Sequence, residues 1–204
     1  MSGLLFSIAL LLDTLSPTNQ AAARPVVEHP TFHREYAARR FVGRIEHFEY
    51  LLDNMHVCSV WSEQTGLIDY RAVLLPDGRL YAENKEKANG WLELVGCDAG
   101  QRLFYMEGTQ RGLFTAKGRG VILVKYKQIS ATEVEYSGKL WVRIDNGVVA
   151  GLAKLFFVFV KGAVDRNFEL VIRQPVDLTS IAWYWPETLR ELHRHLPKIG
   201  RAHV

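Results

Sequence analysis

The 204-residue chain has few cysteines and no long apolar run. The two cysteines, Cys58 and Cys97, lie too far apart in sequence for a compact zinc knuckle. They are interpreted as buried free thiols, with a disulfide as the alternative if the protein is exported. The apolar stretch 155–160 is bracketed by Lys154 and Lys161, which leaves far fewer than the roughly 18 residues that indicate a membrane span.

The chain also lacks the common catalytic signatures. It contains no nucleophile elbow, P-loop, dinucleotide-binding glycine pattern or His-Glu-x-x-His sequence. Its net charge of +3 comes from 25 basic and 22 acidic residues that are interspersed along most of the chain. The sequence therefore predicts no catalytic residue, metal ligand or cofactor, and it does not predict a nucleic-acid partner.

The N-terminus has the pattern of a targeting segment. Leu4 to Leu12 is apolar except for Ser7, and Ala21 and Ala23 place small residues where a signal peptidase reads the chain. No Lys or Arg precedes the apolar run. Residues 1–23 are predicted to be a signal peptide of a protein exported to a bacterial periplasm or the extracellular space. The alternative is a cytoplasmic protein with a buried or disordered start.

The remaining chain is predicted to form a single domain at residues 41–196. Residues 24–40 are polar and contain proline, which predicts a linker or N-terminal arm, and residues 197–204 form a tail. Within Phe41 to Trp61, Phe48, Leu52 and Met55 recur at spacings of three and four, which predicts an amphipathic helix. Six strands follow, separated by short turn segments: Ile68–Leu75, Arg79–Lys85, Trp91–Val95, Arg102–Glu107, Gly120–Ile129 and Glu133–Asp145.

The last of these strands shows the clearest alternation. Apolar side chains, including Val134, Leu140 and Val142, occupy the even-numbered positions, and charged or polar side chains occupy the odd-numbered ones. Trp141 is the one apolar residue among the odd-numbered positions. This pattern predicts an antiparallel strand with one solvated face.

Two helices are predicted after the sheet. The apolar segment Gly147–Arg173 predicts a long helix that ends before Pro175, and a shorter helix is expected from Pro186 to about Leu196. The predicted fold class is α+β: a curved antiparallel meander sheet of about six strands, with helices on one face, a long C-terminal helix and an additional short C-terminal helix.

This order of elements resembles the START-like helix-grip superfamily, also called SRPBCC. The resemblance covers roughly Phe41 to Arg173 and rests on architecture, because the family has no universal motif. It implies a hydrophobic cavity between the sheet and the C-terminal helix. The side chains expected to line this cavity and bind a lipid-like small molecule are Phe104, Met106, Ile122, Val124, Tyr126, Tyr136, Leu140, Val142, Phe156 and Phe159.

Two other functions stay open from the sequence. One is a cyclase or dehydratase on the same scaffold, for which Tyr126, Tyr136, Glu107 and Arg143 would supply polar groups. The other is a structural or interaction protein whose core is filled. Glu46, Glu49, Asp53 and His56 form a polar stripe that could hold an acid/base pair or a metal, and a solvated helix face accounts for the same spacing.

Two surface features could contact a partner. Gly108 to Gly120 is rich in Gly, Arg and Lys, which is typical of a plain hairpin loop. The alternatives are a mobile flap at the cavity mouth and a contact for anionic headgroups. The aromatic run 183–185 precedes a helix that carries Arg190, Arg194 and Lys198. It is interpreted either as a staple onto the core or as a peripheral contact with a membrane surface.

Overall fold

The computed structural model describes residues 2–65, 70–84, 88–111, 115–145 and 172–187. Its centre is a seven-stranded antiparallel sheet in the order β1-β7-β6-β5-β4-β3-β2. The strands are β1 (Phe32–Val42), β2 (Tyr70–Leu74), β3 (Leu80–Asn84), β4 (Ala88–Asp98), β5 (Gln101–Arg111), β6 (Thr115–Ser130) and β7 (Glu133–Ile144). Strands β2 to β7 form a meander, and each pairs with the next in sequence. The predicted α+β class and antiparallel meander are confirmed.

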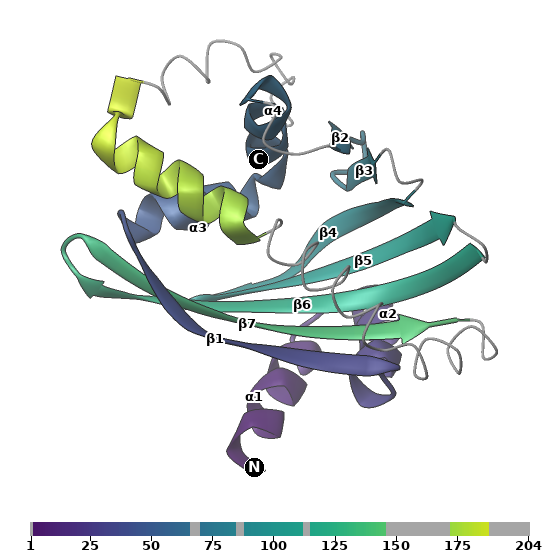
Figure 1. Cartoon of the computed structure of the whole chain (residues 1–204). Helices are drawn as coiled ribbons and strands as arrows, with labels where there is room; N and C mark the ends of the chain where they lie inside the picture. Colours follow the sequence, from purple (N-terminus) through teal and green to yellow (C-terminus); the bar gives the residue numbers. More distant parts are fainter. Residues whose placement is uncertain (1, 66–69, 85–87, 112–114, 146–171, 188–204) are drawn as a thin grey trace.

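Helices cover both faces of this sheet (Figure 1). Helices α1 (Ser2–Asp13) and α2 (Pro17–Glu28) lie on one face. Helices α3 (Ile45–Asp53) and α4 (Met55–Thr65), together with the helical residues 172–184, lie on the other. We call the face under α1 and α2 the outer face and the face under α3 the inner face. The prediction that helices cover one face and leave the other solvated is wrong.

Alternation of side chains along the strands explains the two covered faces. In β5 and β6, Phe104 and Ile122 point to the inner face, whereas Leu103 and Leu123 point to the outer face, and all four are at most 2% exposed. Successive side chains of a strand point to opposite faces, so an unbroken apolar run requires burial on both sides. Trp141, which interrupts the polar parity of β7, belongs to the outer-face core.

Residues 24–40 are not a linker, because they form the end of α2 and most of β1. Strand β1 pairs with β7 along its length, from Phe32 opposite Val142 to Val42 opposite Glu133. The sequence gives little sign of it because β1 lies at the sheet edge, where Phe41 is the only residue of the strand classed as buried. Charged side chains are common on edge strands, since they hinder pairing with other chains.

The N-terminal segment that resembles a signal peptide folds as α1 and most of α2. Ile8, Leu11 and Leu12 of α1, with Ala23 and Val26 of α2, are at most 5% exposed and pack on the outer face. Export of the protein stays a prediction. Within the part of the chain that the structure describes, no helix is long and apolar enough to cross a membrane.

The single helix predicted over residues 41–61 is divided into two. Helix α3 ends at Asn54, whose backbone leaves helical geometry at φ −126° and ψ 54°, and α4 follows at once. At its start α3 has no side-chain cap of its own, and the Ile45 amide donates instead to Oε1 of Gln128 in β6 at 2.9 Å. This bond satisfies one of the otherwise unpaired N–H groups at the helix start and fixes α3 to the sheet.

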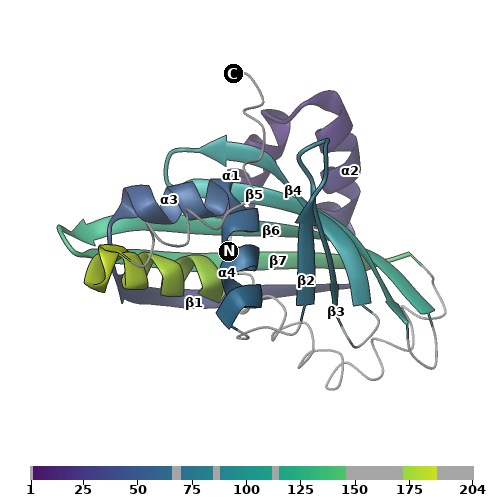
Figure 2. The same cartoon turned by 90° about the horizontal axis from the view of Figure 1, so that it is seen from above.

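The C-terminal helices differ from the prediction where they are described. Residues 172–184 are helical through Pro175, so no break occurs there. This helix lies beside α3 over one end of the sheet (Figure 2). It approaches the end of β1 at Gly43, where a Cβ atom would lie 2.5 Å from Cγ2 of Thr179, and Ser180 Oγ donates to the Val42 carbonyl at 2.9 Å. The predicted helix over 147–173 and most of that over 186–196 lie outside the described residues.

The packing of α3 gives a direct test of the inner core. Phe48 is fully buried, whereas Tyr50 on the same helix is 48% exposed. Replacing Phe48 with Ala should lower the free energy of unfolding by about 3–5 kcal/mol, because the substitution leaves a cavity under α3. The matched control, Tyr50→Ala, should change it by less than about 1 kcal/mol. Urea denaturation followed by circular dichroism measures both free energies of unfolding. Equal losses would contradict the assignment of Phe48 to the buried face of α3 and Tyr50 to its exposed face.

Candidate functional site

The side chains predicted to bind a ligand converge on the inner face, as far as they are described. Five are buried in one hydrophobic cluster with α3, α4 and Ile172: Phe104, Ile122, Val124, Tyr126 and Leu140. Three more, Met106, Tyr136 and Val142, are partly buried against the same cluster. The other two, Phe156 and Phe159, lie outside the described residues. The eight described side chains therefore share the face that the sequence predicted for them, and their contact with a ligand stays a prediction.

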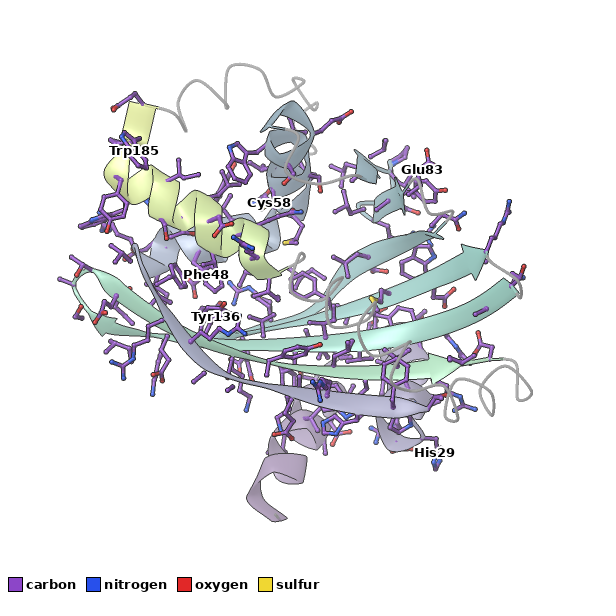
Figure 3. All side chains as sticks on the ribbon, in the orientation of Figure 1. His29, Phe48, Cys58, Glu83, Tyr136 and Trp185 are labelled. Carbon is purple, nitrogen blue, oxygen red and sulfur yellow. The ribbon has the colours of Figure 1, made fainter. Side chains whose placement is uncertain are left out.

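Aromatic rings fill the end of the inner face under α3. The Phe48 ring lies 5.0 Å from that of Phe41, 5.4 Å from that of Tyr126 and 6.2 Å from that of Tyr136, measured between centroids. Figure 3 shows Phe48 pointing from α3 toward the sheet, with Tyr136 beneath it. Edge-to-face and tilted contacts of this kind stabilise a core beyond the area they bury. At this end the residues form packed core.

The opposite end of the inner face carries small residues. Strand pairing places Ala72, Ala82, Gly90, Gly108 and Gly118 in one row across β2 to β6. The three glycines lie close to neighbouring backbone. A Cβ atom on Gly90 would clash with the Glu107 carbonyl oxygen, one on Gly108 would be 3.0 Å from that of Asn89, and one on Gly118 would be 3.2 Å from that of Arg143. In the next row, Met106 lies over Gly120. Among the described residues, the inner face therefore changes from bulky rings under α3 to alanines and glycines at its far end.

The row of glycines also corrects the predicted loop at Gly108–Gly120. Gly108 pairs with Gly118 inside the β5–β6 ladder, which continues to Arg111 and Thr115. Glycine is uncommon inside strands and often marks a bend or a close backbone approach. The described part of this segment is therefore sheet, and a flap is not present in it.

A polar cluster joins α3 to the sheet beside the aromatic rings. Arg102 of β5 donates from Nε to Asp53 Oδ1 at 2.6 Å and from Nη2 to Asp53 Oδ2 at 3.1 Å. The Arg102 side chain is 7% exposed, and its Nη1 donates to the Asp98 and Gln101 carbonyls. A bidentate, largely buried pair of this type fixes the distance and orientation of its two elements.

Tyr126 and Glu49 extend this cluster. The Tyr126 hydroxyl donates to Glu49 Oε1 at 3.0 Å, and the Arg102 guanidinium lies 5.6 Å from the Tyr126 ring centroid. Burial is the largest cause that raises the pKa of Tyr126 above its usual value. The hydrogen bond to Asp53 is the main cause that raises the pKa of Arg102. Tyr126 therefore stays neutral and Arg102 stays charged at physiological pH.

The structure divides the polar stripe predicted on this helix. Glu49 and Asp53 face Arg102 and Tyr126, whereas Glu46 pairs with Arg44 at 3.4 Å, at the exposed start of α3. His56 follows on α4, where partial burial lowers its pKa. Among the described residues, no group of three or more His, Cys, Asp or Glu side chains is arranged to hold a metal ion. The stripe serves mainly to attach α3 to the sheet.

The polar groups proposed for an enzyme do not come together. Tyr126 and Tyr136 lie on the inner face, but Glu107 and Arg143 lie on the outer face. There Glu107 accepts from the Tyr105 hydroxyl at 2.6 Å, and Arg143 donates to the Pro25 carbonyl at 3.1 Å. The alternation that placed Met106 and Val142 inside also places their sequence neighbours outside. That rule, applied to the sequence, would have removed Glu107 and Arg143 from the candidate site.

The two cysteines are unpaired, as the sequence favoured, but the prediction that both are buried is correct only for Cys58. Cys58 is buried in α4 among Leu51, Trp61 and Leu178, and Cys97 is exposed in β4. Burial raises the pKa of the Cys58 thiol, which makes it an unreactive apolar side chain. The alternative disulfide between Cys58 and Cys97 is not formed.

Comparison with known proteins supports only a fold. No protein-family model matches the chain, and no curated protein matches it in sequence. A conserved protein from Geobacillus kaustophilus is similar in structure, with a TM-score of 0.50 and 10% identity over 72% of this chain and 96% of that one.

Two further structures, whose descriptions name a specific protein, have lower TM-scores. The di-domain ARO/CYC BexL of the BE-7585A biosynthetic pathway has a TM-score of 0.45 and 14% identity over 86% of this chain and 60% of that one. Truncated norcoclaurine synthase from Thalictrum flavum has a TM-score of 0.44 and 7% identity over 70% and 92%. At these identities the likeness concerns the fold alone. The observed seven-stranded antiparallel sheet with its helices is consistent, at a coarse level, with a helix-grip fold.

The Arg102–Asp53 pair predicts a large effect of one substitution. Arg102→Ala leaves the Glu49 and Asp53 carboxylates, which lie one turn apart on α3, without their shared cation, and removes packing from Tyr126. Since Asp53 is partly exposed, we expect a loss of about 2–3 kcal/mol in the free energy of unfolding, below that of a fully buried pair. Arg40→Ala, which breaks the exposed pair with Glu135, should cost less than about 1 kcal/mol. Urea denaturation measures the free energy of unfolding of both variants. Similar losses would show that the Arg102–Asp53 pair does not hold α3 to the sheet.

Proposed function

We propose that the protein binds a lipid-like apolar small molecule at the far end of the inner face, where the sheet carries small residues. The observation that supports this is the graded inner face. Under α3 the rings of Phe41, Phe48 and Tyr126 contact one another, whereas toward Gly120 the side chains become small or partly exposed. Ligand pockets are concave and mainly apolar, with few polar groups.

This gradient assigns different roles to the side chains first considered as ligand contacts. Phe104, Ile122 and Leu140 are at most 2% exposed, so they serve as packed core. Met106 and Val142 are partly buried in the row beside the glycines and are the proposed contacts, joined by Leu92 of β4. Tyr136 is also partly buried, but its ring packs against Phe41 and Phe48, so it belongs to the aromatic end.

A peripheral contact with a membrane surface is a second part of the proposal. Trp183, Tyr184 and Trp185, at the end of the helix 172–184, are 37%, 57% and 58% exposed. Among the described residues they belong to none of the hydrophobic core clusters, and Trp185 projects from the outer end of this helix (Figure 3). Trp and Tyr are enriched at membrane–water interfaces, and such a contact would bring the protein to a source of apolar molecules.

Binding can be tested on the purified full-length chain. Native mass spectrometry before and after solvent extraction should reveal a defined apolar adduct. Titration with cis-parinaric acid, a fluorescent fatty acid, should give saturable fluorescence enhancement. Val142→Trp would fill the proposed site and should lower the affinity for cis-parinaric acid at least about tenfold, which corresponds to about 1.4 kcal/mol.

Val73 provides the matched control for this substitution. It is also a valine in a strand, but it is 45% exposed. Val73→Trp should leave binding unchanged, and circular dichroism should show that both variants are folded. Two results would contradict the proposed site and favour an interaction protein with a filled core. One is a protein mass without adduct together with no saturable binding, and the other is an equal loss of affinity for cis-parinaric acid in the two variants.

A further inference from the structure

Removing residues 1–23 would expose the apolar side chains on the outer face of the sheet. Five outer-face side chains on β5, β6 and β7 are at most 6% exposed in the complete chain: Leu103, Tyr105, Val121, Leu123 and Trp141. Most of the apolar side chains that pack against them come from α1, α2 and the turn between them. Contiguous apolar patches of this extent are uncommon on soluble proteins unless a partner covers them.

The N-terminal helices fit this face in detail. Leu15, in the turn after α1, lies against β4 at Gly96, where a Cβ atom would be 3.0 Å from Leu15 Cδ2. Gly96 also marks an irregularity in the pairing of β4 with β5. Any larger residue at position 96 would require Leu15 to move. A cleaved signal peptide needs no complementarity to the mature fold, so this fit indicates a lasting contact.

Polar bonds tie the two helices to each other and to the sheet. Arg24 forms an ion pair with Asp13 at 2.6 Å, which joins residues on opposite sides of the expected cleavage point after Ala23. Gln20 donates to the Leu12 carbonyl, and the Ser16 hydroxyl caps α2 by accepting from the Asn19 amide. Arg143 of β7 donates to the Pro25 carbonyl at 3.1 Å.

The small residue at the expected cleavage point has a structural explanation. Ala23 is fully buried in the middle of α2, where the helix faces the sheet. A side chain larger than alanine would be expected to push α2 away from the sheet. The alanine that resembles a signal-peptidase site is therefore also the residue that close helix–sheet packing requires.

From these contacts we propose that residues 2–28 are retained as a permanent layer of the folded protein, which covers the outer face of the sheet. The apolar character of α1 then serves the outer core. This inference is independent of ligand binding, which concerns the inner face.

The first test is the mass of the full-length chain produced in a bacterial host with an active signal peptidase. The proposal expects a mass that begins at Met1, or at Ser2 after removal of the initiator methionine. A purified protein that begins at Arg24 would overturn it.

A matched pair of leucines in α1 provides the second test. Leu12 is 2% exposed in the outer core, and Leu10 is 59% exposed on the same helix. In the full-length chain, Leu12→Ala should lower the urea midpoint by about 1 M, whereas Leu10→Ala should leave it nearly unchanged. Equal midpoints for both variants and the unmodified chain would overturn the proposal, since they would show that α1 adds nothing to the fold. A loss of stability in Leu12→Ala with normal binding of cis-parinaric acid would separate this layer from the proposed ligand site.

Discussion

Burial of both faces of β5 and β6 is the constraint on which the rest of this structure depends. Leu103 and Phe104 point to opposite sides of the sheet and are both almost completely buried. A strand with apolar side chains on both parities cannot leave either face to solvent. The helices must therefore divide between the two faces, with α1 and α2 on one side and α3, α4 and residues 172–184 on the other.

The two layers are attached by different means. The outer layer rests mainly on aliphatic contacts, such as that of Leu15 at Gly96, with the hydrogen bond from Arg143 to the Pro25 carbonyl. The inner layer combines the Phe48 aromatic cluster with the partly buried Arg102–Asp53 pair and the Gln128 cap of α3. Directional bonds of this kind fix the position of a helix more closely than apolar contacts do. The end of the inner face under α3 is consequently closed, which directs the proposed ligand toward the opposite end.

Several conclusions about fold and site follow from residue patterns alone. The alternation of Glu133–Asp145 and the turn segments between apolar runs predicted β2 to β7, their antiparallel pairing and the set of inner-face side chains. These predictions are correct because the alternation of side chains between the two faces of a strand depends only on adjacent residues. The same periodicity, applied consistently, would have placed Glu107, Trp141 and Arg143 on the outer face, and would have shown that this face also needs a cover.

Only the tertiary structure decided what lies on each face. Strand β1 is recognised by its pairing with β7, because an edge strand needs little apolar alternation. The apolar run of α1 has the composition of a signal peptide, and its place on the sheet is visible only once Leu11 and Leu12 are seen against Leu123 and Trp141. The sequence by itself determined strands β2 to β7 and which of their side chains share the inner face, since these depend on neighbours along the chain. Which helix covers which face depends on contacts between residues far apart in sequence, and these form only when the chain folds.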